Sequence, residues 1–187
     1  DYLHTMTPIE EKYIQILKDE SSHKSLIFLC GSSGDGKSAI IAKNKETFDA
    51  NYNFHIDATH SFKANLTSTQ ALDESFLRYL EGDKSLVVGI NVGILMSYVE
   101  EGSTQLDAIK EHIKIFLDSN QNTDNTFFIN FDDYSKFTLE DSKITSPFIK
   151  SIFEKITLHS SKNPFYTAFK DDIEANSTSI LHQNFKL

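Results

Sequence analysis

The sequence predicts an α/β fold with an open, mainly parallel sheet of about four or five strands flanked by helices. Short apolar runs alternate with amphipathic segments through residues 25–135, which is typical of strands joined by helical crossovers. The first apolar run leads directly into a glycine-rich segment. We expect a leading helix in residues 1–24, a core in 25–135 and a helical C-terminal segment in 136–187. Because the chain begins with Asp1, we expect it to be a fragment of a longer protein.

A motif of the form G-x-x-x-x-G-K-[ST] follows the first predicted strand, residues 26–30. An apolar segment, residues 39–42, follows the motif, so that a strand enters the loop and a helix leaves it, as a P-loop requires. Glycines let the backbone turn with positive φ and approach a ligand closely, and successive N–H groups can then point at phosphate oxygens. The motif consists of Gly31, Ser32, Ser33, Gly34, Asp35, Gly36, Lys37 and Ser38.

The residue types of the motif predict how a nucleoside triphosphate and a magnesium ion would be held. Lys37 supplies a mobile positive charge for the β- and γ-phosphates, and the hydroxyl of Ser38 is suited to bind Mg²⁺. The helix that begins near Gly36 adds the positive end of its dipole. We therefore expect ATP and Mg²⁺ as cofactors. Residues 44–47, Asn-Lys-Glu-Thr, resemble a guanine-reading N-K-x-D motif, but the fourth residue is threonine and the stretch lies on the predicted loop helix, which favours ATP.

The leading helix is predicted to begin at Pro8. Thr7 is a favourable N-cap, proline suits the first helical position, and Glu10 completes a capping box. The helix after the loop is expected to run to about Phe48. A turn then leads to a second strand at residues 54–59.

The middle of the chain is predicted to alternate between helix and strand. A capping box formed by Thr67 and Gln70 starts a helix that ends before Gly82. A buried strand follows at residues 85–91, and a short helix and a longer one then occupy residues 94–117.

The last clear strand, residues 126–131, runs directly into Asp132-Asp133. Beyond it, Ser146-Pro147 and Asn163-Pro164 are each expected to start a helix. The first of these helices is expected to bury one apolar face. That face consists of Ile149, Ile152, Phe153 and Ile156.

Composition limits the functions that this chain can have. Hydrophobic residues make up 39% and charged residues 24%, and no apolar run approaches the roughly 18 residues of a membrane span, so we expect no membrane function. No signal peptide is visible, and the single cysteine, Cys30, suits a reducing cytoplasm. We expect Cys30 to pack beside the loop, although a nearby helix dipole could make it reactive. The net charge of −9 argues against nucleic-acid binding by this segment.

A phosphate loop also needs a carboxylate at the end of a neighbouring strand, to hold Mg²⁺ or orient water. Asp57 ends the second predicted strand and precedes the strand that ends in Asn91, which is the order in AAA-like ATPases. Against this choice, only 19 positions separate Ser38 from Asp57, which leaves no room for the intervening strand that those ATPases usually have. Asp132 and Asp133 follow a more hydrophobic strand but come after the Asn91 strand. We place Asp57 first, as catalytic residue and metal ligand. Asp132 or Asp133 is the second choice, and a simple cap or turn role is the third.

Four other polar residues bear on the function of the site. Asn91 could sense a γ-phosphate through its amide or cap the next helix, and the two roles are equally favoured. His55 and His60 flank Asp57, but strand alternation favours solvent-facing or loop histidines over a metal site. Arg78 is the only arginine, which disfavours a phosphotransferase that clamps two phosphorylated substrates. Any arginine finger would then come from another chain.

Five stretches, in order over most of the chain, resemble the DptF family, the P-loop ATPase-like component of DNA phosphorothioation-dependent restriction systems. The resemblance implies an N-terminal NTPase segment of a larger cytoplasmic bacterial protein, with DptG and DptH as partners and a role in attacking DNA that lacks the protective sulfur. It places Lys37 and Ser38 on the nucleotide motif and Asn91 on a strand end, and DNA contact would come through the complex. Only the first stretch is specific by itself. The stretches are LIFLCGSSGDGKSAII, FHIDATHSF, LVVGINVGIL, FFINFDD and NPFYTAF.

Three functions are compatible with these patterns. The first is an ATP-binding, ATP-hydrolysing domain of a defence assembly, with Lys37, Asn91 and one of the acids in catalysis and with activity that depends on partners or on a homo-oligomer. The second is a nucleotide-gated interaction module with little turnover, because the acid is not settled and no arginine finger is present. The third, a small-molecule phosphotransferase, is disfavoured by the single arginine.

Overall fold

A computed structural model of the chain describes residues 2–20, 23–56, 67–140 and 142–174. The chain divides into two compact units. The larger unit is Pro8–Tyr134, and the smaller combines Asp1–Thr7 with Ser135–Leu187. The chain therefore passes from one unit to the other twice, and we describe each unit by itself.

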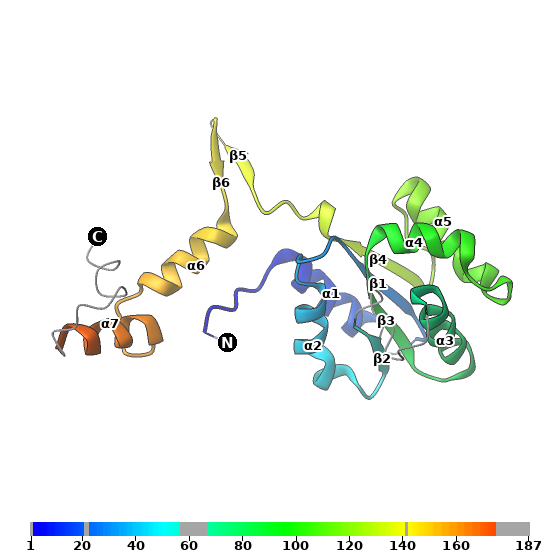
Figure 1. Ribbon diagram of the computed structural model, residues 1–187, viewed down its shortest axis with the longest axis horizontal. Coiled ribbons are helices and arrows are strands. Elements are labelled where there is room, and N and C mark those ends of the chain that lie inside the picture. Colours follow the sequence, from blue (N-terminus) through cyan, green and yellow to red (C-terminus); the bar gives the residue numbers. More distant parts are fainter. Residues whose placement is uncertain (1, 21–22, 57–66, 141, 175–187) are drawn as a thin grey trace. The chain divides into compact units, whose positions relative to one another are not determined.

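A parallel four-stranded sheet forms the centre of the larger unit (Figure 1). The strand order is β2-β3-β1-β4, so that β1, which leads into the glycine-rich loop, lies between β3 and β4. Every residue of β1 is buried, because the strand has a neighbour on each side and helices on both faces, and its sequence is accordingly apolar throughout. The α/β prediction is confirmed. The strands are β1 (Leu26–Cys30), β2 (Tyr52–His55), β3 (Ser85–Ile90) and β4 (Thr126–Asn130).

Helices cover both faces of this sheet (Figure 1). α1 and α2 enclose one core with Ile27 and Leu29 of β1, and α3, α4 and α5 enclose the other with Phe28. In the second core, the ring of Phe128 stacks on Phe28 at 4.7 Å and on Phe116 at 4.2 Å between centroids. The elements are α1 (Pro8–Asp19), α2 (Lys37–Phe48), α3 (Ser68–Glu81), α4 (Val92–Glu101), the 3₁₀ turn η1 (Thr104–Leu106), α5 (Asp107–Ser119) and the 3₁₀ turn η2 (Phe131–Asp133).

Most predicted boundaries in this unit agree with the structure, and the second strand is the exception. The capping box of α3 is present, with the N–H of Gln70 donating to Thr67 Oγ1 at 3.2 Å and the N–H of Thr67 donating to Gln70 Oε1 at 2.9 Å. β2 begins at Tyr52, earlier than predicted, since Tyr52 is buried and pairs with Ser85. The prediction missed this start because the asparagines on either side of Tyr52 are typical of a turn. Ile56, which the prediction included, follows the end of the strand, and the remaining predicted residues, 57–59, lie outside the described residues.

The smaller unit contains an antiparallel hairpin that we did not predict and two predicted helices. The N-terminal residues join these helices, with Tyr2 Oη donating to Lys155 O at 2.9 Å and Lys155 Nζ donating to His4 O. The hairpin strands are too short for a two-residue period to be recognised in the sequence. The elements are β5 (Thr138–Glu140), β6 (Lys143–Thr145), α6 (Pro147–Thr157) and α7 (Pro164–Glu174).

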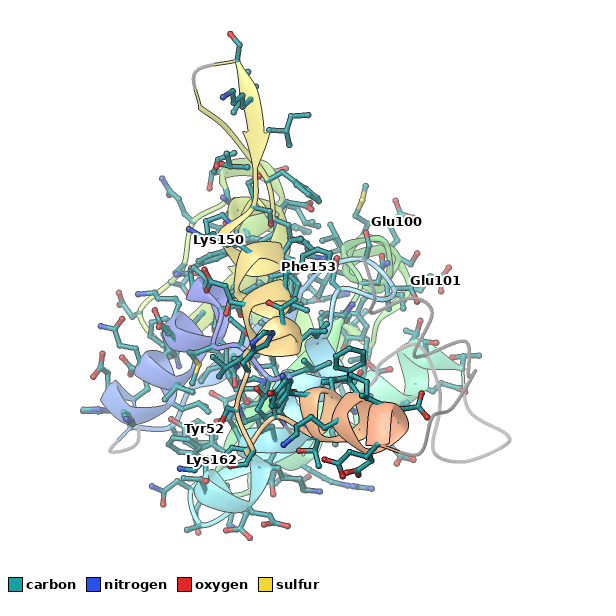
Figure 2. All side chains as sticks on the ribbon, turned by 90° about the vertical axis from the view of Figure 1, so that its left-hand side faces the viewer. Tyr52, Glu100, Glu101, Lys150, Phe153 and Lys162 are labelled. Atoms are coloured by element: carbon teal, nitrogen blue, oxygen red, sulfur yellow. The ribbon has the colours of Figure 1, made fainter. Side chains whose placement is uncertain are left out.

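The predicted burial of one α6 face is wrong. No residue of α6 is buried, and Ile149 is 38% and Phe153 is 61% exposed. Figure 2 shows the position of Phe153 on this helix. Ile152 and Ile156 are only partly buried. Helical spacing correctly gives one apolar face, but spacing does not show whether a second layer covers that face.

Candidate functional site

The loop between β1 and α2 turns through two glycines with left-handed backbone. Gly34 has φ 85° and Gly36 has φ 103°, values that side chains other than glycine rarely adopt. Gly31 is needed for close packing, because a Cβ there would lie 2.9 Å from Asp35 Oδ2 and 3.0 Å from Phe131 Cβ. The glycines of the motif therefore serve the turn and the packing of η2 against the loop.

Main-chain N–H groups gather where the loop enters α2. Gly36 is the N-cap and supplies no side-chain bond, and the first turn of α2 has no acidic residue. Among the described residues, nothing accepts a hydrogen bond from the N–H groups of Ser33, Gly34, Lys37 or Ser38. Free N–H groups at the positive end of a helix dipole form the arrangement that binds phosphate.

Lys37 bends back over the loop that it follows. Its Nζ donates to the main-chain oxygens of Gly31 at 2.9 Å and of Ser32 at 2.7 Å. Within the described ranges no carboxylate pairs with this ammonium group, so its positive charge is held in place by neutral acceptors. An incoming phosphate would therefore meet a positioned, uncompensated cation.

A cavity of about 250 Å³ lies beside the loop. One part of its wall is the loop with the start of α2, and the other part is the end of β3. The adjacency of β1 and β3 brings these two segments together, because the carboxyl ends of parallel strands lie at one edge of the sheet. The lining residues are Ser33, Gly34, Gly36, Lys37, Ser38, Ala39, Gly89, Ile90 and Asn91.

Asn91 caps α4 and also lines this cavity. Its Oδ1 accepts a hydrogen bond from the N–H of Gly93 at 2.7 Å, which confirms the capping role. In the part of the chain that the structure describes, nothing accepts a hydrogen bond from its Nδ2. The cap orients the side chain and leaves two amide donors for a ligand, so capping and phosphate sensing are compatible.

Three elements meet at Gly89, in the interior of β3. A Cβ at this position would lie 2.5 Å from Ile56 O and 2.8 Å from Ile41 Cδ1. Ser38 Oγ donates to the same Ile56 oxygen at 3.4 Å. Glycine at position 89 therefore allows the chain after β2 to lie against the start of α2, next to the predicted magnesium ligand. Asp57, the next residue in the chain, lies outside the described residues.

The alternative acids Asp132 and Asp133 lie in η2, directly after β4. Both are exposed, and neither lines the cavity beside the loop. The N–H of Asp132 donates to Asn130 Oδ1 at 3.2 Å, and the carboxylate of Asp133 accepts from Asn120 Nδ2 at 3.4 Å. The first contact makes Asn130 the N-cap of η2, and the second joins η2 to the residue that caps the end of α5, so neither contact shows the cap or turn carboxylate that we considered.

Three further predicted positions have structural roles. Cys30 is fully buried, and burial raises the pKa of its thiol more than nearby Lys37 lowers it, so the residue is packed and unreactive. The expectation that His55 faces solvent or a loop is wrong, because it is buried with Nδ1 2.7 Å from Ser75 Oγ. Asn44 donates to a main-chain oxygen one turn earlier in α2, so it is a helix residue rather than a base reader.

Comparisons with known protein families, with curated proteins and with solved structures found no match. Within residues 2–20, 23–56, 67–140 and 142–174, no three His, Cys, Asp or Glu side chains cluster as a metal site would require. His60, the other histidine near Asp57, lies outside these ranges. In the same ranges, no helix has the length and apolarity needed to cross a membrane.

Proposed function

We propose that the unit Pro8–Tyr134 binds Mg²⁺·ATP at the loop Gly31–Ser38 and hydrolyses it. The observation that carries this proposal is the loop itself, where free N–H groups, a helix N-terminus and the uncompensated ammonium group of Lys37 converge on one cavity. The packing of the described residues does not use these N–H donors, so water or a ligand must complete their hydrogen bonds.

For the metal, we propose Ser38 and Asp57 as ligands. The bond from Ser38 Oγ to Ile56 O supports this choice, because it brings the hydroxyl to the residue that precedes Asp57 in the chain. When bound, Mg²⁺ would neutralise charge on the β- and γ-phosphates. Asp132 and Asp133 become the weaker alternatives for orienting water, since neither lines the cavity.

The wider role that we propose is in DNA phosphorothioation-dependent restriction, as an anti-phage defence component. This part of the proposal rests on the five stretches that resemble the DptF family, with DptG and DptH as the implied partners in the cytoplasm. The acidic chain would then reach DNA through its complex.

A nucleotide-gated interaction module with little turnover is the second candidate. The observation that favours it is the composition of the cavity wall, which among the described residues contains no carboxylate and no arginine. Arg78 lies elsewhere, on α3, where its guanidinium pairs with Glu74 at 3.2 Å. Turnover would then depend on a cation from another chain.

Calorimetric titration of ATP and GTP with Mg²⁺ into the chain tests the binding site. We expect ATP to bind, and Lys37→Ala to weaken binding at least about tenfold, as expected for the loss of a charge-assisted contact to phosphate. Lys45→Ala, an exposed lysine on the same helix, is the matched control and should bind as the unaltered chain does. Equal affinity of a folded Lys37→Ala variant would refute the site.

Phosphate release separates the two candidates and assigns the acid. If hydrolysis occurs, alone or with the partner proteins, we expect Asp57→Asn to abolish it while ATP binding persists, and Asp132→Asn to leave most of it. Loss of activity in Asp132→Asn instead would move the metal or water role to η2. Binding without hydrolysis under any of these conditions would favour the interaction module.

A further inference from the structure

β2 forms one edge of the sheet, because among the described residues it pairs only with β3. The register and the bond from the N–H of Ser85 to Asn51 O, at 3.0 Å, fix the alternation along β2. The main-chain groups of Asn51 and Asn53 face β3, and those of Tyr52 and Phe54 therefore face away from the sheet. No described residue makes a hydrogen bond to these outward groups.

A groove of about 630 Å³ runs along this edge. All four residues of β2 line it, together with Lys45 in the last turn of α2, Asp49 just after that helix, and residues of α3. Figure 1 shows β2 at the edge of the sheet, with α2 and α3 on opposite sides of it. A strand edge between two helices is the shape that receives an added extended segment, because main-chain donors and acceptors line its floor.

The groove is more basic than the chain as a whole. Lys45, Arg78 and Lys84 line it, against Asp49 and Glu74. Glu74 is already paired with Arg78, and Lys84 Nζ donates to the main-chain oxygen of Asp49 at 2.6 Å. Among the described residues no carboxylate pairs with Lys45 or Lys84. The groove therefore has a positive balance on a chain whose net charge is −9, which favours an acidic ligand.

We propose that this groove docks an extended, acidic segment of a partner protein as an additional strand beside β2. Main-chain bonds to Tyr52 and Phe54 would supply affinity, and the ammonium groups of Lys45 and Lys84 would select acidic side chains. The groove shares no lining residue with the cavity at the phosphate loop, so this proposal stands apart from nucleotide binding.

The probe is a short synthetic peptide of alternating glutamate and valine, compared with a lysine–valine peptide of the same length. Fluorescence anisotropy should show the acidic peptide binding at least about tenfold more tightly, with affinity that falls as salt rises. Lys45→Glu should remove most of this preference. ATP affinity, measured on the same variant, should not change.

Phe54→Pro and Phe54→Ala form the decisive pair. Both variants lose the ring, but only proline removes the outward N–H, and it does so without removing a donor to β3. We expect peptide binding to be lost in Phe54→Pro and kept in Phe54→Ala. Equal binding by the two folded variants, or no binding of the acidic peptide by the unaltered chain, would overturn the proposal.

Two further measurements keep the proposal testable if Phe54→Pro does not fold. Two further peptides carry N-methyl groups on the odd or on the even main-chain nitrogens. In an added strand only one of these two sets of N–H groups faces β2, so only one of the two peptides should lose binding. Unchanged binding by both methylated peptides would refute strand addition. Sedimentation of the chain alone should show a monomer. A concentration-dependent dimer that Lys45→Glu disrupts would instead assign the edge to a second copy of the chain and overturn the acidic partner.

Discussion

The carboxylate of Asp35 accepts a hydrogen bond from the main-chain N–H of Ser32 at 2.6 Å, so the phosphate loop contains an anion of its own. This bond closes the loop across its first turn and places Asp35 Oδ2 where a Cβ on residue 31 would collide with it. A bound triphosphate would bring more negative charge to the loop, and the carboxylate would then oppose it.

Replacing Asp35 with asparagine should therefore tighten ATP binding. The amide oxygen can still accept from Ser32, while the opposing charge is removed, and we expect a gain of about 1 kcal/mol, roughly fivefold in affinity. Asp35→Ala, which also loses the loop bond, should gain less. Calorimetry on the two variants checks this, and weaker binding by Asp35→Asn would show that the charge serves the metal rather than opposing the phosphate.

Gly89→Ala should destabilise the larger unit and weaken nucleotide binding together. The added Cβ would lie 2.5 Å from Ile56 O, a main-chain atom that cannot rotate away, so we expect a loss of about 1–3 kcal/mol in urea unfolding. Adding Ile41→Val removes the second close contact but not the first, and should restore little. Full rescue by Ile41→Val would place the strain on the side chain and contradict this account.

The ion pair between Glu10 of α1 and Lys43 of α2, at 3.3 Å, should contribute to stability through the buried partner. Glu10 is 1% exposed and Lys43 is 38% exposed. Lys43→Met would therefore leave the buried carboxylate of Glu10 without its contact to the ammonium group. We expect a loss of about 1–3 kcal/mol in urea unfolding, reduced by the partial exposure of the lysine. Lys45→Met, on the exposed surface of the same helix, should lose less than about 0.5 kcal/mol.

Tyr98→Phe should destabilise the contact between α3 and α4. Tyr98 Oη donates to Asp73 Oδ1 at 2.6 Å, and the same oxygen accepts from the N–H of Ser103 at 3.1 Å. The phenylalanine variant should lose about 1–2 kcal/mol, and Asp73→Ala should lose more because it leaves the buried Tyr98 hydroxyl and the half-buried N–H of Ser103 without an acceptor. A larger loss of unfolding free energy in Tyr98→Phe than in Asp73→Ala, measured by urea unfolding, would contradict this interpretation.

Alkaline pH should unfold the larger unit through its buried tyrosines. Burial, with a smaller effect of Glu20, raises the pKa of Tyr52 from 10.0 to about 12. The pKa of Tyr52 in the folded chain lies above its pKa in the unfolded chain, so the contribution of this group to stability is complete below pH 10. The contribution is lost as pH rises from 10 toward 12, at about 1.4 kcal/mol per pH unit for one proton. Tyr52→Phe should flatten this slope in urea unfolding, and an unchanged slope would assign the effect to other groups.

The sequence predicted the larger unit well because its signals are local. A capping box at Thr67, an apolar strand before Gly31 and an asparagine before α4 each determine structure within a few neighbouring residues. The phosphate loop belongs to this class, since one continuous stretch supplies its glycines, its lysine and its N–H groups.

Other features depend on what lies opposite in space. A glycine within an apolar strand signals a close approach, but only the structure shows that Gly89 faces Ile56 O. The groove along β2 results from the strand order, which leaves Tyr52 and Phe54 with outward main-chain groups. Likewise, helical spacing contains no information about whether the described residues cover Phe153, which is exposed.

The two passages between the units start from different neighbours of the nucleotide-binding elements. One enters α1, whose Glu10 pairs with Lys43 of α2, and the other leaves η2, whose Phe131 packs against Gly31. The first passage therefore starts from a helix that contacts α2, and the second starts beside the phosphate loop itself. The smaller unit is thus joined to the larger one by two chain segments, so that cutting either segment alone would leave the two units covalently connected.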